Sequence, residues 1–226
     1  MALELDLAAL VRKRTLSPSM AALFEAIGRE RRSFLVFAVP RQAGKTTLMR
    51  AILECAPPGT PLHVLDSNAA FAAAELVGGP GYLVIPEVAP YAVAPGYLWG
   101  EPVRRAFALL AGGLSLATAL HASDLRAAID VLGRGNGVPP EALGRLEFAI
   151  EIRMTGGRGT PERFVHAVHQ LRPAGGNGGE AGLEARLLHR RDDVTGAFEV
   201  LEEPTGLPLE SRRDALERYE AMLKSG

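Results

Sequence analysis

Cysteine is almost absent from this chain of 226 residues, in which Cys55 is the single one. One thiol excludes any disulfide within the chain, and we expect Cys55 to act as a small apolar core residue. The sequence also lacks a signal peptide and any apolar run long enough to span a bilayer. These absences predict a cytoplasmic protein with no transmembrane segment.

Lysine is scarce as well. Only Lys13, Lys45 and Lys224 occur among the 25 basic residues, and all the others are arginine. A compact ammonium and a planar guanidinium are not interchangeable. Lys45, the one lysine well inside the chain, therefore marks a position that arginine would not serve.

Charge is balanced overall but unevenly spread. The net charge is −1 and the isoelectric point about 6.5, which gives no strong signal for nucleic-acid binding. Residues 51–103 contain no Lys or Arg, whereas residues 12–14 and 29–32 are rich in them. We expect those basic groups to be solvated helix ends. Contact with an acidic partner, or peripheral association with the inner face of a membrane, is the alternative.

The pattern of apolar residues predicts an α/β fold. Four segments read as buried strands and alternate with helical patterns, which is typical of a mostly parallel sheet flanked by helices: residues 33–39, 62–66, 82–85 and 115–121. Beyond Gly156, period-2 alternation predicts antiparallel strands, followed by a closing helix at 209–223. We divide the chain into an N-terminal helical segment (1–32), a core (33–155) and a C-terminal β extension with its helix (156–226).

The junction after the first predicted strand carries the strongest motif. There Gly44-Lys45-Thr46-Thr47 connects a strand to a helix, which is the context of a phosphate-binding loop. We expect Lys45 to reach the outer phosphates of a nucleotide and the Thr46 hydroxyl to bind Mg²⁺. The backbone that would face the phosphates comprises Pro40, Arg41, Gln42, Ala43, Gly44, Lys45, Thr46 and Thr47. The motif departs from its pattern at Val39, where a glycine is usual, and Pro40 has no N–H to offer.

Polar residues end the neighbouring strands. Asp66 follows the second predicted strand, Glu87 the third, and His121 the fourth. Because the carboxyl ends of parallel strands lie at one edge of a sheet, these side chains are candidates for the rim around the loop. Glu87 is the better candidate for an acid that orients water and holds Mg²⁺. Asp66 is open to a second reading, as the cap of the following helix.

The order of these segments resembles the type II/type IV secretion ATPase family, the motors of secretion systems and pilus assembly. Residues 40–48 look like its Walker A loop, Leu83-Val-Ile-Pro-Glu87 its Walker B strand, and Ala117-Thr-Ala-Leu-His121 its His box, while Asp66 stands in its Asp box. The resemblance implies a RecA-like P-loop NTPase fold in three layers, with ATP and Mg²⁺ as cofactors. It also implies catalytic roles for Glu87 and Asp66, and a γ-phosphate sensor in His121.

The resemblance further implies a homo-oligomer, hexameric in the family, or a secretion or pilus partner. Arginines from a neighbouring subunit would complete the site, and the candidates are Arg104, Arg105, Arg126, Arg134 and Arg145. Several boxes are degenerate, since Pro86 replaces a glycine and one acid of the Asp box is missing. We therefore expect a slow Mg²⁺-dependent ATPase. The alternatives are a nucleotide-binding regulatory subunit and, less favoured, a small-molecule kinase.

Overall fold

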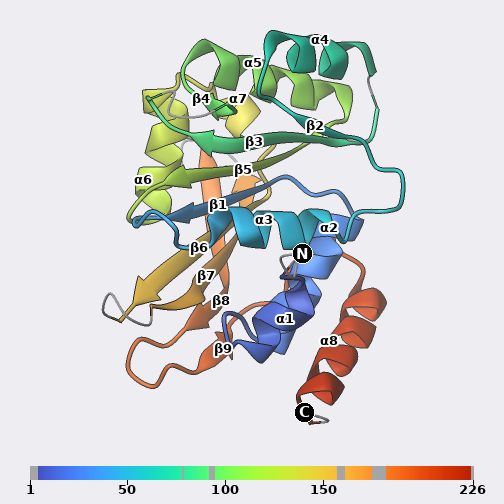
Figure 1. Ribbon diagram of the computed structural model, residues 1–226, viewed down its shortest axis with the longest axis vertical. Coiled ribbons are helices and arrows are strands. Elements are labelled where there is room, and N and C mark those ends of the chain that lie inside the picture. Colours follow the sequence, from blue (N-terminus) through green and yellow to red (C-terminus); the bar gives the residue numbers. More distant parts are fainter. Residues whose placement is uncertain (1–4, 78, 92–94, 157–160, 175–181, 225–226) are drawn as a thin grey trace.

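The computed structural model describes residues 5–77, 79–91, 95–156, 161–174 and 182–224. In it, a nine-stranded sheet runs through the molecule in the order β2-β3-β5-β1-β6-β7-β8-β9, with β4 beside β3 (Figure 1). The strands are β1 Phe34–Ala38, β2 Leu62–Val64, β3 Tyr82–Val88, β4 Tyr97–Leu98, β5 Ser115–His121, β6 Phe148–Thr155, β7 Glu162–Pro173, β8 Leu183–Arg191 and β9 Phe198–Val200. The helices are α1 Leu7–Arg12, α2 Pro18–Arg29, α3 Lys45–Leu53, α4 Asn68–Val77, α5 Glu101–Leu109, α6 Leu125–Asp130, α7 Pro140–Leu143 and α8 Leu209–Lys224, with a 3₁₀ turn η1 Leu110–Gly112 and a π turn η2 Val131–Gly135.

The sheet has a parallel half and an antiparallel half. Strands β2, β3, β5, β1 and β6 pair in parallel, with β1 between β5 and β6. From β6 onward, β7, β8 and β9 pair antiparallel. The predicted fold class, a mostly parallel sheet followed by antiparallel C-terminal strands, is confirmed. Strands β1, β3 and β5 therefore end at the same edge of the sheet.

Helices cover the sheet on both faces and make it the middle of three layers. One apolar cluster joins the sheet to α1, α2, α3 and α8, and the other joins it to α4, α5, α6 and α7. All five residues of β1 are buried, as expected of a strand with helices on both sides. The phosphate-loop candidate thus follows a strand that is buried along its whole length.

The N-terminal helices are set by local capping and by contacts with the end of the chain. Ser17-Pro18 is a helix-start signal in the sequence, and in the structure Ser17 caps α2, with its hydroxyl accepting from Met20 N, while Pro18 opens the first turn. Helix α8 packs along α2, where the buried carboxylate of Glu25 accepts from Arg218 and Tyr219. The ends of the chain are thereby joined on one face, as Figure 1 shows for α1 and α8. The three-part division of the chain stays a prediction.

Three local features differ from the sequence expectations. Residues 89–100 carry Pro, Tyr, Gly and Trp without periodicity, which predicts a loop, yet this segment contains the two-residue strand β4, which pairs with Glu87 and Val88. Residues 134–137, Arg-Gly-Asn-Gly, predict a turn but begin within η2, and the sequence did not predict α7. All are too short to produce a period in the sequence. The glycine-rich segment 173–182 predicts a turn, and most of it (175–181) lies outside the described residues, as do residues 92–94.

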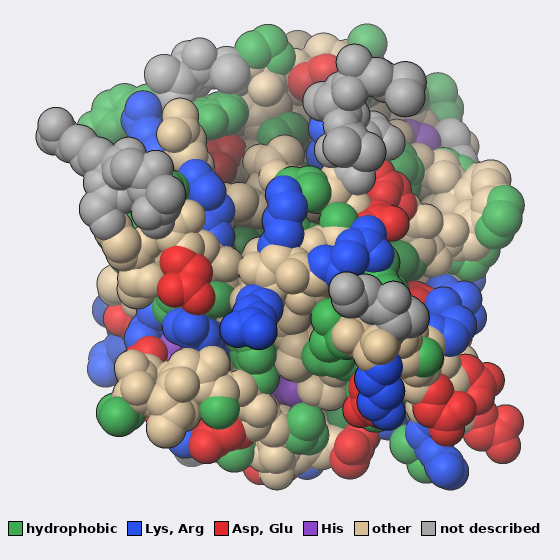
Figure 2. Space-filling model, turned by 60° about the horizontal axis from the view of Figure 1, so that its bottom comes forward, with side chains coloured by type: hydrophobic (Ala, Val, Ile, Leu, Met, Phe, Trp, Pro, Cys, Tyr) green, Lys and Arg blue, Asp and Glu red, His purple; other side chains and the backbone are tan. Residues whose placement is uncertain are grey.

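Arginines of the antiparallel half are mostly paired with acids. Arg186 pairs with Glu202, Arg190 with Glu199, and Arg191 with Glu162. Figure 2, which brings this part of the molecule forward, shows Lys and Arg side chains standing among acidic ones. Among the helices described, none is long and apolar enough to cross a membrane.

Helices α2 and α3 approach most closely at Gly28. A Cβ at this position would lie 2.3 Å from Ile52 O and 2.8 Å from Cys55 Cβ. We predict that Gly28→Ala lowers the free energy of unfolding by about 1–3 kcal/mol, because overpacking outweighs alanine's higher helix propensity. Gly112→Ala is the control, since nothing lies within 4 Å of its Cβ position. Equal unfolding midpoints in urea for the two variants would contradict this close packing.

One buried histidine, His189, and one partly buried histidine, His169, make stability depend on pH. Burial lowers the pKa of His169 and of His189 to about 4. As the pH falls from about 6.5 towards 4, the unfolded chain binds protons that the folded protein does not, so stability is lost in this window, by up to about 3 kcal/mol per histidine. We predict that His189→Gln reduces the loss of unfolding free energy between pH 7 and pH 4.5, measured by urea denaturation. An unchanged pH dependence would show that His189 is protonated without cost.

Candidate functional site

Strand β1 leads into α3 through a turn that leaves the start of the helix uncapped. Gly44 occupies the N-cap position with φ +98°, a conformation that favours glycine. No side chain caps the first turn of α3, which begins at Lys45. The first N–H groups of this helix are therefore free to bind an anion, and the helix dipole favours negative charge at the same point.

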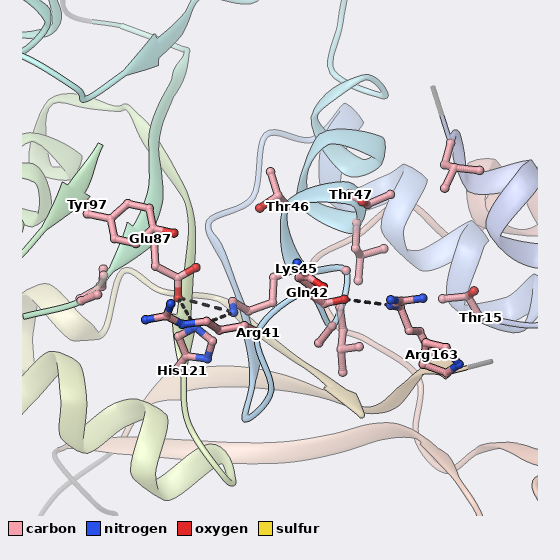
Figure 3. Close-up of a pocket in the computed structure, with 18 of the residues that line it drawn as sticks. Thr15, Arg41, Gln42, Lys45, Thr46, Thr47, Glu87, Tyr97, His121 and Arg163 are labelled. Carbon is pink, nitrogen blue, oxygen red and sulfur yellow. Dashed lines mark hydrogen bonds and ion pairs between the residues drawn. The ribbon is translucent and has the colours of Figure 1, made fainter. Parts of the chain in front are cut away.

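Lys45 extends from this turn into the interior. Only 6% of the residue is exposed, and its Nζ lies 3.5 Å from Glu87 Oε1 on β3. It also lies 3.4 Å from Nε2 of His121, at the end of β5. Figure 3 shows the three side chains converging beside the loop. The sequence expectation that Glu87 and His121 lie near Lys45 agrees with this geometry.

Burial changes the chemistry of Lys45. Loss of hydration lowers the pKa of the Lys45 ammonium, and the nearby charge of Glu87 offsets part of this effect. Arg41, on the loop itself, lowers it further. An additional anion in the pocket would favour the charged ammonium again. The site is thus electrostatically suited to a polyphosphate.

His121 is oriented by the backbone of β1. Its Nδ1 lies 3.0 Å from the carbonyl oxygen of Val39, which can only accept, so Nδ1 carries a proton. In the neutral ring Nε2 is then an acceptor and faces Lys45. Nε2 also lies 3.5 Å from Glu87 Oε1. His121 is held with one fixed nitrogen pointing into the pocket.

These groups line a pocket of about 1100 Å³, ample for a nucleoside triphosphate. The loop lies across its middle. Glu87, His121 and Tyr97 lie on one side of the loop, and Arg163 and Thr15 on the other (Figure 3).

The pocket gathers most of the predicted site residues. Glu87, His121 and the loop from Arg41 to Thr47 line it, whereas Pro40 and Asp66 are not among the lining residues. Asp66 follows β2, three strands from β1 in the sheet and so about 14 Å across it. Asp66 does not cap α4 either, because the hydroxyl of Ser67 accepts from Ala70 N. The catalytic role of Asp66 stays a prediction to which this placement adds no support.

The lining residues fit a nucleotide with Mg²⁺. Oε1 of the buried Glu87 has no hydrogen-bond partner among the described residues, and 3.5 Å from Lys45 is long for such a bond. A buried carboxylate oxygen without a hydrogen-bond donor can accept a hydrogen bond from a metal-bound water. Thr46 is exposed at the start of α3 and lines the same pocket, so its hydroxyl can serve a hard cation.

Sequence reasoning missed the far side of the pocket. Arg163 on β7 donates from Nε to Gln42 O at 2.8 Å, and Thr15 accepts from Val165 N at 2.7 Å. Lys13 also lines the pocket. No sequence signal placed them here, because the pairing of β7 with β6 depends on tertiary register.

The arginines considered for a neighbouring site are mostly engaged within the chain. Arg104 donates to Asn136 O, Arg105 pairs with Glu75, and Arg134 pairs with Asp130. None of the five candidates lines the pocket. Their proposed role in another subunit stays a prediction.

The fold and the pocket together define a class of protein. A glycine turn leads from β1 into α3, and β5 stands between β1 and the acidic strand β3, with helices on both faces. This is the RecA-like P-loop NTPase fold.

A solved structure with a similar fold is the VirB11 ATPase from the Brucella suis type IV secretion system, in complex with sulphate. The TM-score is 0.50 at 17% sequence identity, and the match covers 74% of this chain and 55% of that one. This chain thus spans about half the length of the structure it matches, and the likeness shows the fold alone. No family model and no curated protein matches the sequence.

The loop carries a backbone strain that can be tested. Gln42 has φ +62°, a left-handed conformation that disfavours side chains. We predict that Gln42→Gly stabilises the nucleotide-free protein by up to about 1 kcal/mol, after glycine's larger entropy in the unfolded chain is counted. Gln42→Val should destabilise it, because a β-branched residue resists positive φ. Thermal unfolding of the variants measures both effects, and a lower midpoint for Gln42→Gly would contradict the strain.

Proposed function

We propose that this chain binds ATP with Mg²⁺ in the pocket around Lys45 and hydrolyses it slowly. The observation that carries the proposal is the buried ammonium at an uncapped helix start, between a carboxylate and an imidazole. The fold, shared with a VirB11 ATPase, supports it. The sulphate named with that structure is chemically similar to a phosphate group, which fits an anion site.

The roles of the residues follow from their positions. The loop from Arg41 to Thr47 presents backbone N–H groups to the phosphates, and Lys45 reaches the outer ones. Thr46 and Glu87 would hold Mg²⁺, which supplies positive charge against the phosphate oxygens when it is bound. Pro40 has no N–H, so it shapes the loop without binding.

Hydrolysis requires Glu87 to change partners. In the structure the Glu87 carboxylate faces Lys45. When a triphosphate draws the ammonium to the phosphates, Glu87 becomes free to accept a proton from water. The water oxygen attacks the γ-phosphorus, and the bond to the β-phosphate oxygen breaks, giving ADP and inorganic phosphate. As a γ-phosphate sensor, His121 would have to donate from Nε2, because phosphate oxygens only accept hydrogen bonds. This requires a proton on both ring nitrogens, since Nδ1 already faces the Val39 carbonyl oxygen.

A regulatory nucleotide-binding subunit is the second candidate. It is favoured by the position of Asp66 away from the lining residues, which leaves Glu87 as the only predicted catalytic acid in the pocket. A protein of this kind would bind ATP without turning it over.

We extend the proposal to assembly and location. The resemblance to secretion and pilus motors favours a homo-oligomer, hexameric by analogy, or a partner from such a system. It also favours a cytoplasmic protein, with peripheral association at the inner membrane face as an option. Sizing of the protein with and without Mg²⁺-ATP tests the assembly.

Lys45 provides the direct test of nucleotide binding. We predict that Lys45→Ala weakens ATP binding at least about tenfold, since it removes a charge-assisted contact with phosphate. Lys224→Ala, at the end of α8, is the matched control. Isothermal titration measures both variants, and parental affinity in Lys45→Ala would reject the proposed site.

Glu87→Gln separates the two candidate functions. In a slow ATPase this variant should bind ATP and lose turnover, measured as phosphate release, because the amide cannot accept the proton of water. If the parent shows no turnover above background, the regulatory subunit is the better description.

A further inference from the structure

Arg163 is attached to the phosphate loop rather than to an acid. Its Nε donates to the carbonyl oxygen of Gln42 at 2.8 Å. Its Cδ lies 3.7 Å from the point where a Cβ on Gly44 would stand, so the side chain lies over the loop. Among the described residues, no carboxylate forms an ion pair with Arg163, in contrast to Arg186, Arg190 and Arg191 of β8.

The carbonyl that Arg163 holds belongs to the strained residue of the loop. Gln42 has φ +62°. In a trans peptide the carbonyl of one residue and the N–H of the next point in opposite directions. A Gln42 carbonyl fixed towards Arg163 therefore turns the Ala43 N–H away from β7. That N–H has no hydrogen-bond partner among the described residues, although Ala43 is buried.

The start of β7 is itself firmly held. Arg191 pairs with Glu162 and lies over the ring of Phe164 at 3.9 Å, so it fixes both neighbours of Arg163. Val165 N donates to Thr15 O at 2.7 Å. Arg163 thus extends from a strand with several contacts to a strained loop residue, across the pocket from Glu87 and His121 (Figure 3).

We propose that Arg163 is a positioning residue, which fixes the peptide between Gln42 and Ala43 so that its N–H, and not its carbonyl, faces a bound phosphate. The inference rests on the proposed nucleotide binding. Without this contact the peptide is free to flip, by rotation about ψ of Gln42 and φ of Ala43, which would direct the carbonyl oxygen at the anion. The C-terminal β extension would in this way set the shape of the phosphate loop.

The test compares three ligands on variants of the full chain. Arg163→Met keeps the aliphatic stem and removes the donor, and Arg163→Lys keeps a donor. Arg172→Met is the control, because Arg172 is exposed near the other end of the same strand. Dissociation constants for ATP, ADP and inorganic tripolyphosphate are measured by isothermal titration, together with the thermal midpoint of each free variant.

We expect Arg163→Met to weaken all three ligands by a similar factor, about tenfold or more, the usual effect of losing a charge-assisted hydrogen bond. Arg163→Lys should recover part of the loss, and Arg172→Met should bind as the parent does.

Each other outcome has a distinct meaning. If the parent binds neither ATP nor tripolyphosphate, the proposed function fails. If the parent binds and Arg163→Met binds equally well, the positioning role is overturned, even when the thermal midpoint falls. If Arg163→Met has a lower affinity for ATP but parental affinity for tripolyphosphate, Arg163 contacts the nucleoside, and its action through the loop is overturned.

Discussion

The burial of the Lys45 ammonium is the constraint on which the pocket depends. Taking a charge out of water is costly unless other groups compensate for it, and here they come from two further strands. Glu87 ends β3 and His121 ends β5, on the same side of β1. The strand order brings them together, because β5 lies between β1 and β3. The pocket is thus arranged around one positive charge.

The loop combines a flexible residue with a strained one. Gly44 takes its left-handed conformation without penalty, whereas Gln42 takes a similar one against its preference. Such strain persists only where the surroundings over-determine the backbone. Here the surroundings include β7, a strand of the antiparallel half. The parallel half supplies the acid and the imidazole, and the antiparallel half supports the loop from the other side.

The sequence predicted the parts of this arrangement that depend on local pattern. Ser17 and Pro18 marked the start of α2, and the apolar run of β1 followed by Gly44 marked the loop. Glu87 and His121 were placed near Lys45 because parallel strands end at one edge. The same argument did not show how far Asp66 lies from the loop, since strand ends share an edge but not a position along it, and β2 lies three strands from β1. Arg163 could not be found, because its contact depends on how β7 pairs with β6.

The scarcity of lysine has a chemical consequence. Lys13 and Lys45 both line the pocket, and Lys224 lies in the last turn of α8. A nucleotide analogue with an amine-directed acyl group would therefore meet two of the three lysine side chains in one cavity. Because burial lowers the pKa of Lys45, more of that amine is uncharged and nucleophilic than is usual for lysine. Covalent labelling of this chain would therefore be selective for the pocket for two reasons: the chain has few lysines, and two of the three line the cavity.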